Sequence, residues 1–116
     1  MARFTHLHVH TEYSTLDGAS KIPVLVKKAV ADGMTAIAIT DHGNMFGVKE
    51  FFNHITKHNK NPEAAKIKPI LGCEVYVAAN DRKQKKTKED ASGYHLILLA
   101  KNKKGYHNLI KLVSLG

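Results

Sequence analysis

The chain of 116 residues has a single cysteine, Cys73, and no long apolar run. One cysteine excludes an internal disulfide framework and suits a reducing compartment. No stretch approaches the roughly 18 apolar residues that a membrane-spanning helix needs, and the N-terminus lacks the apolar core of a secretory signal peptide. We therefore expect a cytoplasmic protein of one domain, or of part of one.

Acidic residues are also scarce, with 10 Asp and Glu against 18 Lys and Arg, so the net charge is +8. A basic balance of this size favours nucleic acid or another polyanion as partner. Much of the positive charge lies in two short stretches, residues 82–88 and 101–104. Each stretch has two possible interpretations, a solvated loop or a surface that contacts phosphate.

The apolar residues recur with the periods of both strands and helices. They predict strands at residues 4–10, 35–40, 67–78 and 94–100, and helices at residues 23–32, 46–57 and 104–113. In the second helix we expect Val48, Phe51, Phe52 and Ile55 to be buried. Strands that alternate with helices indicate the α/β class with a mostly parallel sheet, either doubly wound or closed into a barrel.

Side chains of the metal-ligand type lie at the ends of these predicted strands. His8 and His10 are two residues apart on a strand, so both rings face one side and could hold one ion. Glu74 interrupts an apolar run, which is unfavourable unless its carboxylate is paired or metal-bound. Its neighbour Cys73 must point to the opposite face, and we expect it to be a packed apolar side chain. His95 opens the last strand, where a buried structural histidine is the alternative.

Asp41 and His42 directly follow an apolar strand. We interpret His42 as a ligand, and Asp41 as a hydrogen-bond acceptor for it or a second ligand. An Asx-type turn is the alternative for this pair. Asp17 lies in a turn-like segment, where a turn or capping role is the simpler interpretation of that residue alone.

The carboxyl ends of parallel strands meet on one rim, so we expect these residues to converge. Imidazole and carboxylate together suit Zn²⁺, Mn²⁺ or Fe²⁺. Two or three ions bridged by Glu74 could activate water and clamp the oxygens of a phosphate ester. The pattern therefore predicts a metallohydrolase site. The remaining histidines lack this placement and are interpreted as structural: His6, His54, His58 and His107.

Four segments resemble a known family. They are HLHVHTEYSTLDG at 6–18, AITDHGNMFG at 38–47, KPILGCEVY at 68–76 and YHLILLAKN at 94–102. Together they make the chain similar to the polymerase-and-histidinol-phosphatase (PHP) domain, and within that family to the N-terminal part of bacterial replicative DNA polymerase III α subunits. The resemblance covers essentially the whole chain.

The resemblance implies a distorted (β/α)7 TIM-like barrel with up to three divalent ions, Zn²⁺ or Mn²⁺, at its C-terminal rim. Carried over residue by residue, His8 and His10 would hold one ion with Glu74. Glu74 and His95 would hold the second. Asp17 and His42 would hold the third. Glu74, His42 and Asp41 are the residues expected to be catalytic.

The implied activity of the domain is that of a metal-dependent phosphoesterase or 3′–5′ proofreading exonuclease. The implied parent is a DNA-directed DNA polymerase, a nucleotidyltransferase whose partners are DNA and other replisome subunits, with no membrane. The 20 residues between Glu74 and His95 hold no inserted exonuclease domain, which favours the α-subunit type.

The family's barrel continues beyond the equivalent of Gly116 and has later ligands that are not found here. We therefore expect residues 1–116 to be the N-terminal portion of a PHP domain, with weakened metal binding and little activity alone. Exposed strand edges would favour a homo-oligomer.

Two other functions remain open. One is a stand-alone phosphatase similar to histidinol phosphatase, although the extended match at residues 13–18 and 45–47 favours the polymerase. The other is a non-catalytic module that braces the polymerase or docks a proofreading subunit.

Overall fold

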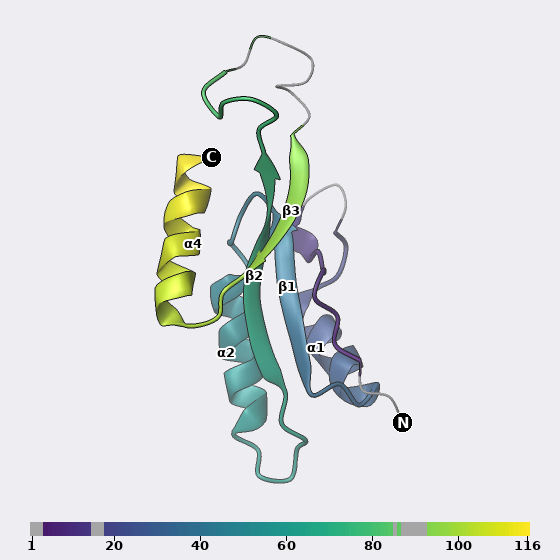
Figure 1. The fold of residues 1–116 in the computed structure, drawn as a ribbon. Coiled ribbons are helices and arrows are strands. Elements are labelled where there is room, and N and C mark those ends of the chain that lie inside the picture. Colours follow the sequence, from purple (N-terminus) through teal and green to yellow (C-terminus); the bar gives the residue numbers. More distant parts are fainter. Residues whose placement is uncertain (1–3, 15–17, 85, 87–92) are drawn as a thin grey trace.

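The computed structural model describes residues 4–14, 18–84, 86 and 93–116. Helices and strands alternate along the chain, and Figure 1 shows their arrangement. The elements are η1 (Glu12–Ser14), α1 (Ile22–Ala31), β1 (Ala36–His42), α2 (Val48–Asn59), β2 (Lys68–Val77), β3 (Tyr94–Leu99) and α4 (Lys103–Leu115).

Helix α1 forms where apolar residues recur at helical spacing. Ile22, Val26 and Ala29 are buried along one face of it. Pro23 lies in the first turn, where its missing N–H group is not needed. Gly33 follows the helix with a φ of 76°, a conformation that commonly ends helices. The helix predicted at residues 23–32 is therefore confirmed, shifted by one residue.

Helices α2 and α4 lie within two residues of their predicted bounds. The buried face of α2 consists of Val48, Phe51 and Ile55. The predicted burial of Phe52 is wrong, because 47% of this residue is exposed. Phe52 follows Phe51 directly and therefore lies about 100° further around the helix, outside its buried face.

The three strands form one sheet in the order β1-β2-β3. Strands β1 and β2 are parallel, as predicted, but β2 and β3 are antiparallel. The fold is thus α/β with a mixed sheet, and the prediction of a mostly parallel sheet is wrong for β3. In the part of the β2–β3 connection that the structure describes there is no crossover helix, which a parallel connection needs. Strand β3 therefore begins beside the end of β2 (Figure 1).

Residues 4–10 are not a strand, although one was predicted. The Ala38 amide donates to the His6 carbonyl at 3.1 Å, and the Thr40 amide donates to the Val9 carbonyl at 2.8 Å. His6 and Val9 are three residues apart, whereas Ala38 and Thr40 are two apart, so the register slips between them. The Val9 amide donates to the Thr40 hydroxyl at 2.8 Å. The segment therefore follows the edge of β1 without a regular ladder.

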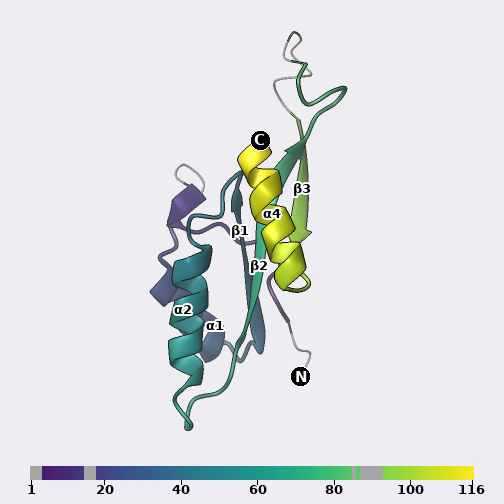
Figure 2. The same cartoon turned by 90° about the vertical axis from the view of Figure 1, so that its left-hand side faces the viewer.

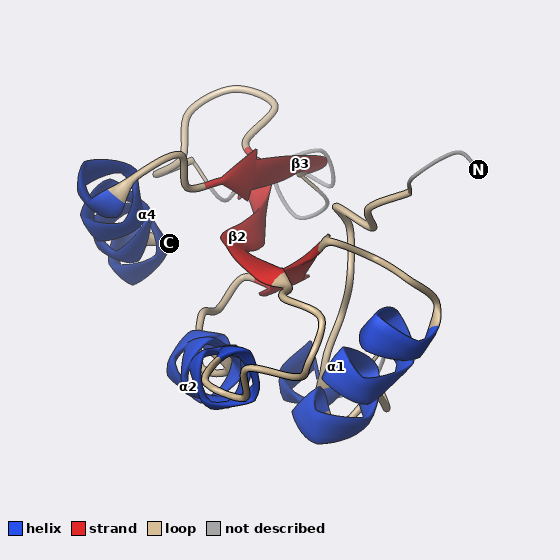
Figure 3. Ribbon diagram, turned by 90° about the horizontal axis from the view of Figure 1, so that it is seen from below, coloured by secondary structure: helices blue, strands red, loops and turns tan. Residues whose placement is uncertain are grey.

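The main core lies between the sheet and the helices α1 and α2, which cover one of its faces (Figure 3). From β1, Ile37 and Ile39 point into this core. Helix α4 packs along β2 apart from α1 and α2 (Figure 2). The buried members of the core are Ile22, Val26, Ala29, Ile37, Ile39, Val48, Phe51, Ile55 and Ile67.

Among the described residues, the helices are too short or too polar for any of them to cross a membrane.

Gly72 provides a test of how tightly the sheet is packed. A Cβ atom here would lie 2.5 Å from the Leu98 carbonyl oxygen and 2.8 Å from Leu99 Cδ2. We expect Gly72→Ala to lower the free energy of unfolding by about 1–3 kcal/mol, because the backbone of β3 would have to move. Urea unfolding followed by circular dichroism measures this.

The control for this experiment is Gly105→Ala in α4, where the nearest atom to an added Cβ is 3.6 Å away. It should be neutral or stabilise the chain by up to about 1 kcal/mol, because alanine favours the helix. Equal stability of the Gly72→Ala variant and the wild type would contradict the packing described.

Candidate metal centre

One buried carboxylate, that of Glu74 in β2, is surrounded by four histidines from three other segments. Only 1% of Glu74 is exposed. Its Oε2 atom lies 2.5 Å from His10 Nε2, 3.1 Å from His8 Nε2 and 3.4 Å from His42 Nδ1. Its Oε1 atom contacts His95 Nδ1. The predicted convergence of these five residues is confirmed, while their roles as ligands stay predictions.

The registers of the two strand pairs explain how His42 and His95 reach Glu74. His42 is the Cα partner of Glu74 in the parallel pair, so both side chains lie on the same face. His95 is the partner of Tyr76 in the antiparallel pair. Because β3 runs the opposite way, its first residues lie beside the last residues of β2. His95 thus reaches the predicted rim from the start of its strand.

His8 and His10 reach the carboxylate from the extended segment along β1. Thr40 binds Val9, the residue between them, through both its backbone amide and its hydroxyl. This double contact positions both flanking rings, whose centroids are 4.9 Å apart and whose Nε2 atoms are 3.1 Å apart.

Three of these residues form a group that could hold a metal ion. One ligand atom each from His8, His10 and Glu74 lie within 4.8 Å of one another. Two imidazole nitrogens and a carboxylate oxygen are ligands typical of Zn²⁺, Mn²⁺ and Fe²⁺. The donor set therefore fits a divalent ion of this kind.

Asp41 lies on the other face of the sheet. Its Oδ1 accepts hydrogen bonds from the Thr11 amide at 2.6 Å and the Ser14 hydroxyl at 2.7 Å. Its Oδ2 accepts one from the Thr11 hydroxyl at 2.8 Å. Consecutive residues of a strand face opposite sides, so Asp41 and His42 point apart. The expected place of Asp41 beside the His42 ring is thus not observed, and its catalytic role stays a prediction.

Asp17 lies outside the described residues, so its assignment as a ligand stays a prediction. Cys73 is fully buried, as predicted, on the face opposite to Glu74. Burial, together with the negative charge of Asp41, raises the pKa of the Cys73 thiol to about 11. This thiol is therefore protonated at neutral pH and is a poor metal ligand.

Tyr76 belongs to the site and was not predicted. Its hydroxyl is hydrogen-bonded to His42 Nδ1 at 2.5 Å. Its ring packs edge-on against His95, with centroids 4.9 Å apart and an interplanar angle of 85°. Its place could have been predicted from its spacing, because Tyr76 is two residues from Glu74 and residues two apart on a strand share a face.

Comparison with known proteins identifies the family of the chain. The sequence profile of the PHP domain matches residues 6–116. The chain belongs to the PHP domain family.

The chain is also similar to proteins named DNA polymerase III subunit alpha. It is 49% identical to that of Borreliella burgdorferi, 50% to that of Treponema pallidum and 46% to that of Helicobacter pylori. These matches cover 99%, 98% and 97% of this chain, but 10%, 9% and 9% of the relatives. The chain thus spans about a tenth of the length of these curated relatives and matches their N-terminal region.

The charge at the centre of this PHP chain depends on the histidines. Burial is the largest single influence on Glu74 and by itself raises the pKa of the carboxyl group. Opposing it are hydrogen bonds with His8, His95 and His10 and the positive charge of His42, which together lower the pKa to about 2. The carboxylate therefore stays ionised although it is almost completely buried.

The lowered pKa predicts how the metal-free PHP chain responds to acid. The folded pKa of about 2 lies below the ordinary value of 4.5. The contribution of Glu74 to stability is therefore fully present above pH 4.5 and is lost as the pH falls from 4.5 toward 2. Urea unfolding in the presence of a chelator, across this window, should give a steeper loss for the wild type than for Glu74→Gln.

Glu63→Gln, which removes an exposed carboxylate in the α2–β2 loop, is the control and should keep the wild-type slope. Parallel curves for the wild type and Glu74→Gln would show that the histidine contacts do not stabilise the ionised carboxylate.

Proposed function

We propose that this chain is the N-terminal portion, residues 1–116, of the PHP domain of a bacterial DNA polymerase III α subunit. We further propose that its histidine cluster holds divalent ions for the hydrolysis of phosphate esters. The observation that carries this proposal is the arrangement around Glu74, a buried carboxylate in contact with four imidazoles. The names of the relatives support the polymerase assignment.

The residues present suit Zn²⁺ or Mn²⁺. His8, His10 and Glu74 would hold the first ion, and His95 would share Glu74 with a second. His42 would hold a third ion together with Asp17. Bound divalent ions would supply positive charge to the oxygens of a phosphate ester and polarise its P–O bonds.

The side chains of this chain position that centre and leave it accessible. The Tyr76 hydroxyl fixes the ring of His42 through Nδ1, and Thr40 fixes the backbone between His8 and His10. The side chains of His8 and His95 are 54% and 59% exposed, so the cluster opens to the surface. We infer that the substrate is the terminal phosphodiester at the 3′ end of DNA. A 3′–5′ proofreading exonuclease activity would hydrolyse it.

In the complete protein, the elements described here would form the first half of a distorted (β/α)7 barrel. That protein would catalyse DNA-directed DNA synthesis in the cytoplasm, with DNA and other replisome subunits as partners. The 116-residue chain alone would have little activity. It would associate with other copies through exposed apolar residues of β3 and α4, of which Tyr94 and Leu115 are 68% and 57% exposed.

A structural role is the second candidate function. Its support is the burial of Glu74, which joins β2 to three other segments and could stabilise the domain without catalysis. A stand-alone phosphatase is less well supported, because the relatives reported above are polymerase subunits.

Metal binding by the 116-residue chain is the first test. We expect Zn²⁺ or Mn²⁺ to bind and to raise the melting temperature, because an ion that binds only the folded state stabilises it. His8→Ala and Glu74→Gln should each weaken binding by at least about tenfold, because they remove ligand atoms or their charge. Isothermal titration calorimetry measures both effects.

The control is His107→Ala on α4, an exposed histidine outside the cluster, which should bind metal as the wild type does. Binding unaffected by His8→Ala and Glu74→Gln would contradict the proposed centre.

The same substitutions in the complete polymerase distinguish catalysis from bracing. We expect His8→Ala to abolish removal of a mismatched 3′ nucleotide while primer extension stays near wild type. A lower melting temperature with exonuclease activity retained would instead assign the cluster a structural role. Unchanged values in every assay would contradict both functions.

A further inference from the structure

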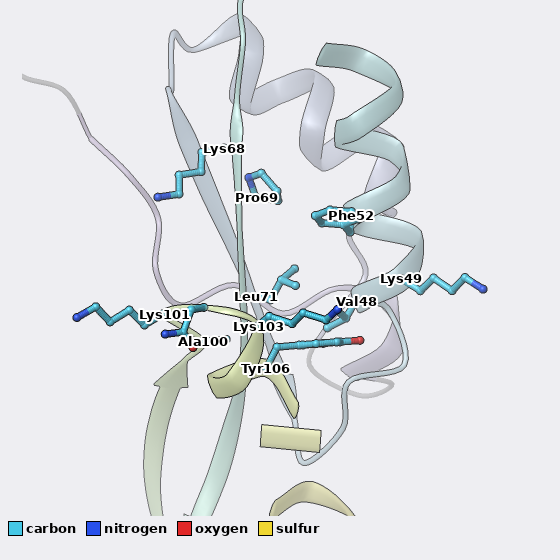
Figure 4. Close-up of a pocket in the computed structure, with 11 residues that line it drawn as sticks. Val48, Lys49, Phe52, Lys68, Pro69, Leu71, Ala100, Lys101, Lys103 and Tyr106 are labelled. Carbon is cyan, nitrogen blue, oxygen red and sulfur yellow. The ribbon is translucent and has the colours of Figure 1, made fainter. Parts of the chain in front are cut away.

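A hollow of about 500 Å³ lies between α2, the start of β2 and the start of α4. Its apolar lining includes Val48 and Phe52 from α2, Pro69 and Leu71 from β2, and Tyr106 from α4. Figure 4 shows these side chains around a common space. Phe52 is the residue whose burial was predicted wrongly, and almost half of its surface is open here.

Four lysines surround this apolar lining. Lys49 comes from α2, Lys68 from the start of β2, and Lys101 and Lys103 from the entry into α4. In Figure 4, Lys68 and Lys101 extend to one side of the hollow and Lys49 to the other. No carboxylate is found among the residues that line it. The hollow therefore combines an apolar interior with a positively charged rim.

The hollow is separate from the candidate metal centre. Leu71 and Glu74 are three residues apart on β2, so their side chains point to opposite faces of the sheet. No member of the histidine cluster lines the hollow. An occupant of this space would not contact the metal ligands.

The backbone around the hollow offers few hydrogen-bonding groups to an added β-strand. Strand β3 pairs with β2 only from Gly72 onward, so among the described residues no strand pairs with the preceding part of β2 on that side. The Leu71 carbonyl already accepts a hydrogen bond from the Ala100 amide at 2.7 Å. Pro69, the next residue that faces this edge, has no N–H group to donate. The hollow therefore favours side-chain insertion over strand addition.

We propose that this hollow is a docking site for an acidic peptide segment of a partner protein. A large apolar side chain of the segment would pack against Phe52 and Leu71, and flanking carboxylates would pair with the four lysines. A nucleic-acid strand needs a line of cations that follows its backbone, whereas these lysines surround one apolar space. This proposal does not depend on the metal centre.

The two parts of the site would contribute differently to binding. Exposed lysines attract an acidic segment over a distance and mainly raise the association rate, an effect that salt screens. The apolar anchor would contribute most of the affinity, because a few buried apolar contacts dominate typical interfaces. Substitution of Phe52 should therefore weaken binding more than substitution of a lysine.

Selection from random peptides displayed on phage, with the 116-residue chain as the immobilised target, tests the proposal. We expect the enriched peptides to combine Asp or Glu with Leu, Phe or Trp. Synthetic copies measured by fluorescence anisotropy should bind Phe52→Ser at least about tenfold more weakly than the wild type. Lys49→Glu should weaken them severalfold, and added salt should weaken them further.

Two variants are matched controls. Lys57→Glu changes a lysine on α2, the helix that carries Lys49. Phe46→Ser removes a phenylalanine that is 76% exposed. Both residues lie outside the hollow. Both should bind the peptides as the wild type does, and circular dichroism checks that all four variants are folded.

Three results would overturn the proposal. The first is that no peptide is enriched. The second is that peptides are enriched but bind Phe52→Ser as tightly as the wild type. The third is that single-stranded oligodeoxythymidine binds the wild type and that Phe52→Ser abolishes this binding. The last result would assign the hollow to nucleic acid instead.

Discussion

Burial of the Glu74 carboxylate is the constraint on which the rest of the site depends. A charged group removed from water is strongly unfavourable unless polar partners surround it. Here the partners are imidazoles from the N-terminal segment, β1 and β3, so one carboxylate joins three parts of the chain to β2. The carboxylate also gathers the rings: His10 and His42, whose ring centroids are only 4.0 Å apart, both contact its Oε2 atom.

The sequence pattern predicted the members of this cluster but not the path by which each arrives. The apolar runs that end in Asp41-His42 or contain Glu74 can be recognised directly in the sequence. Strand direction is not, because a period of two is the same for parallel and antiparallel strands. His95 was expected at the rim as part of a parallel sheet and reaches it because β3 is antiparallel. The register slip at residues 4–10 also depends on a tertiary contact, the hydrogen bond to the Thr40 side chain.

Alternation along the strands explains the roles of two neighbouring pairs. Asp41 and Cys73 are Cα partners facing the helices, and His42 and Glu74 are partners facing the cluster. The sequence shows Asp41 next to His42 and suggests a shared function, but the sheet separates them. Asp41 instead holds Thr11 and Ser14, which follow the His8-x-His10 segment. This contact could not be predicted, because its donors lie in a segment with no regular pattern. Its effect is to fix the chain just beyond His10 against β1.

Strand β2 thus carries two unrelated surfaces, one on each face. The step between them is short, since Leu71 lines the hollow and Glu74 holds the histidines. Gly72 lies between them in a position where an added Cβ would meet the backbone of β3, so this part of the strand has little room to move. A closely packed interior has low compressibility, so the two surfaces keep a nearly fixed separation. A partner docked at Phe52 would therefore be held at a fixed position relative to the cluster. Such an arrangement suits attachment rather than regulation.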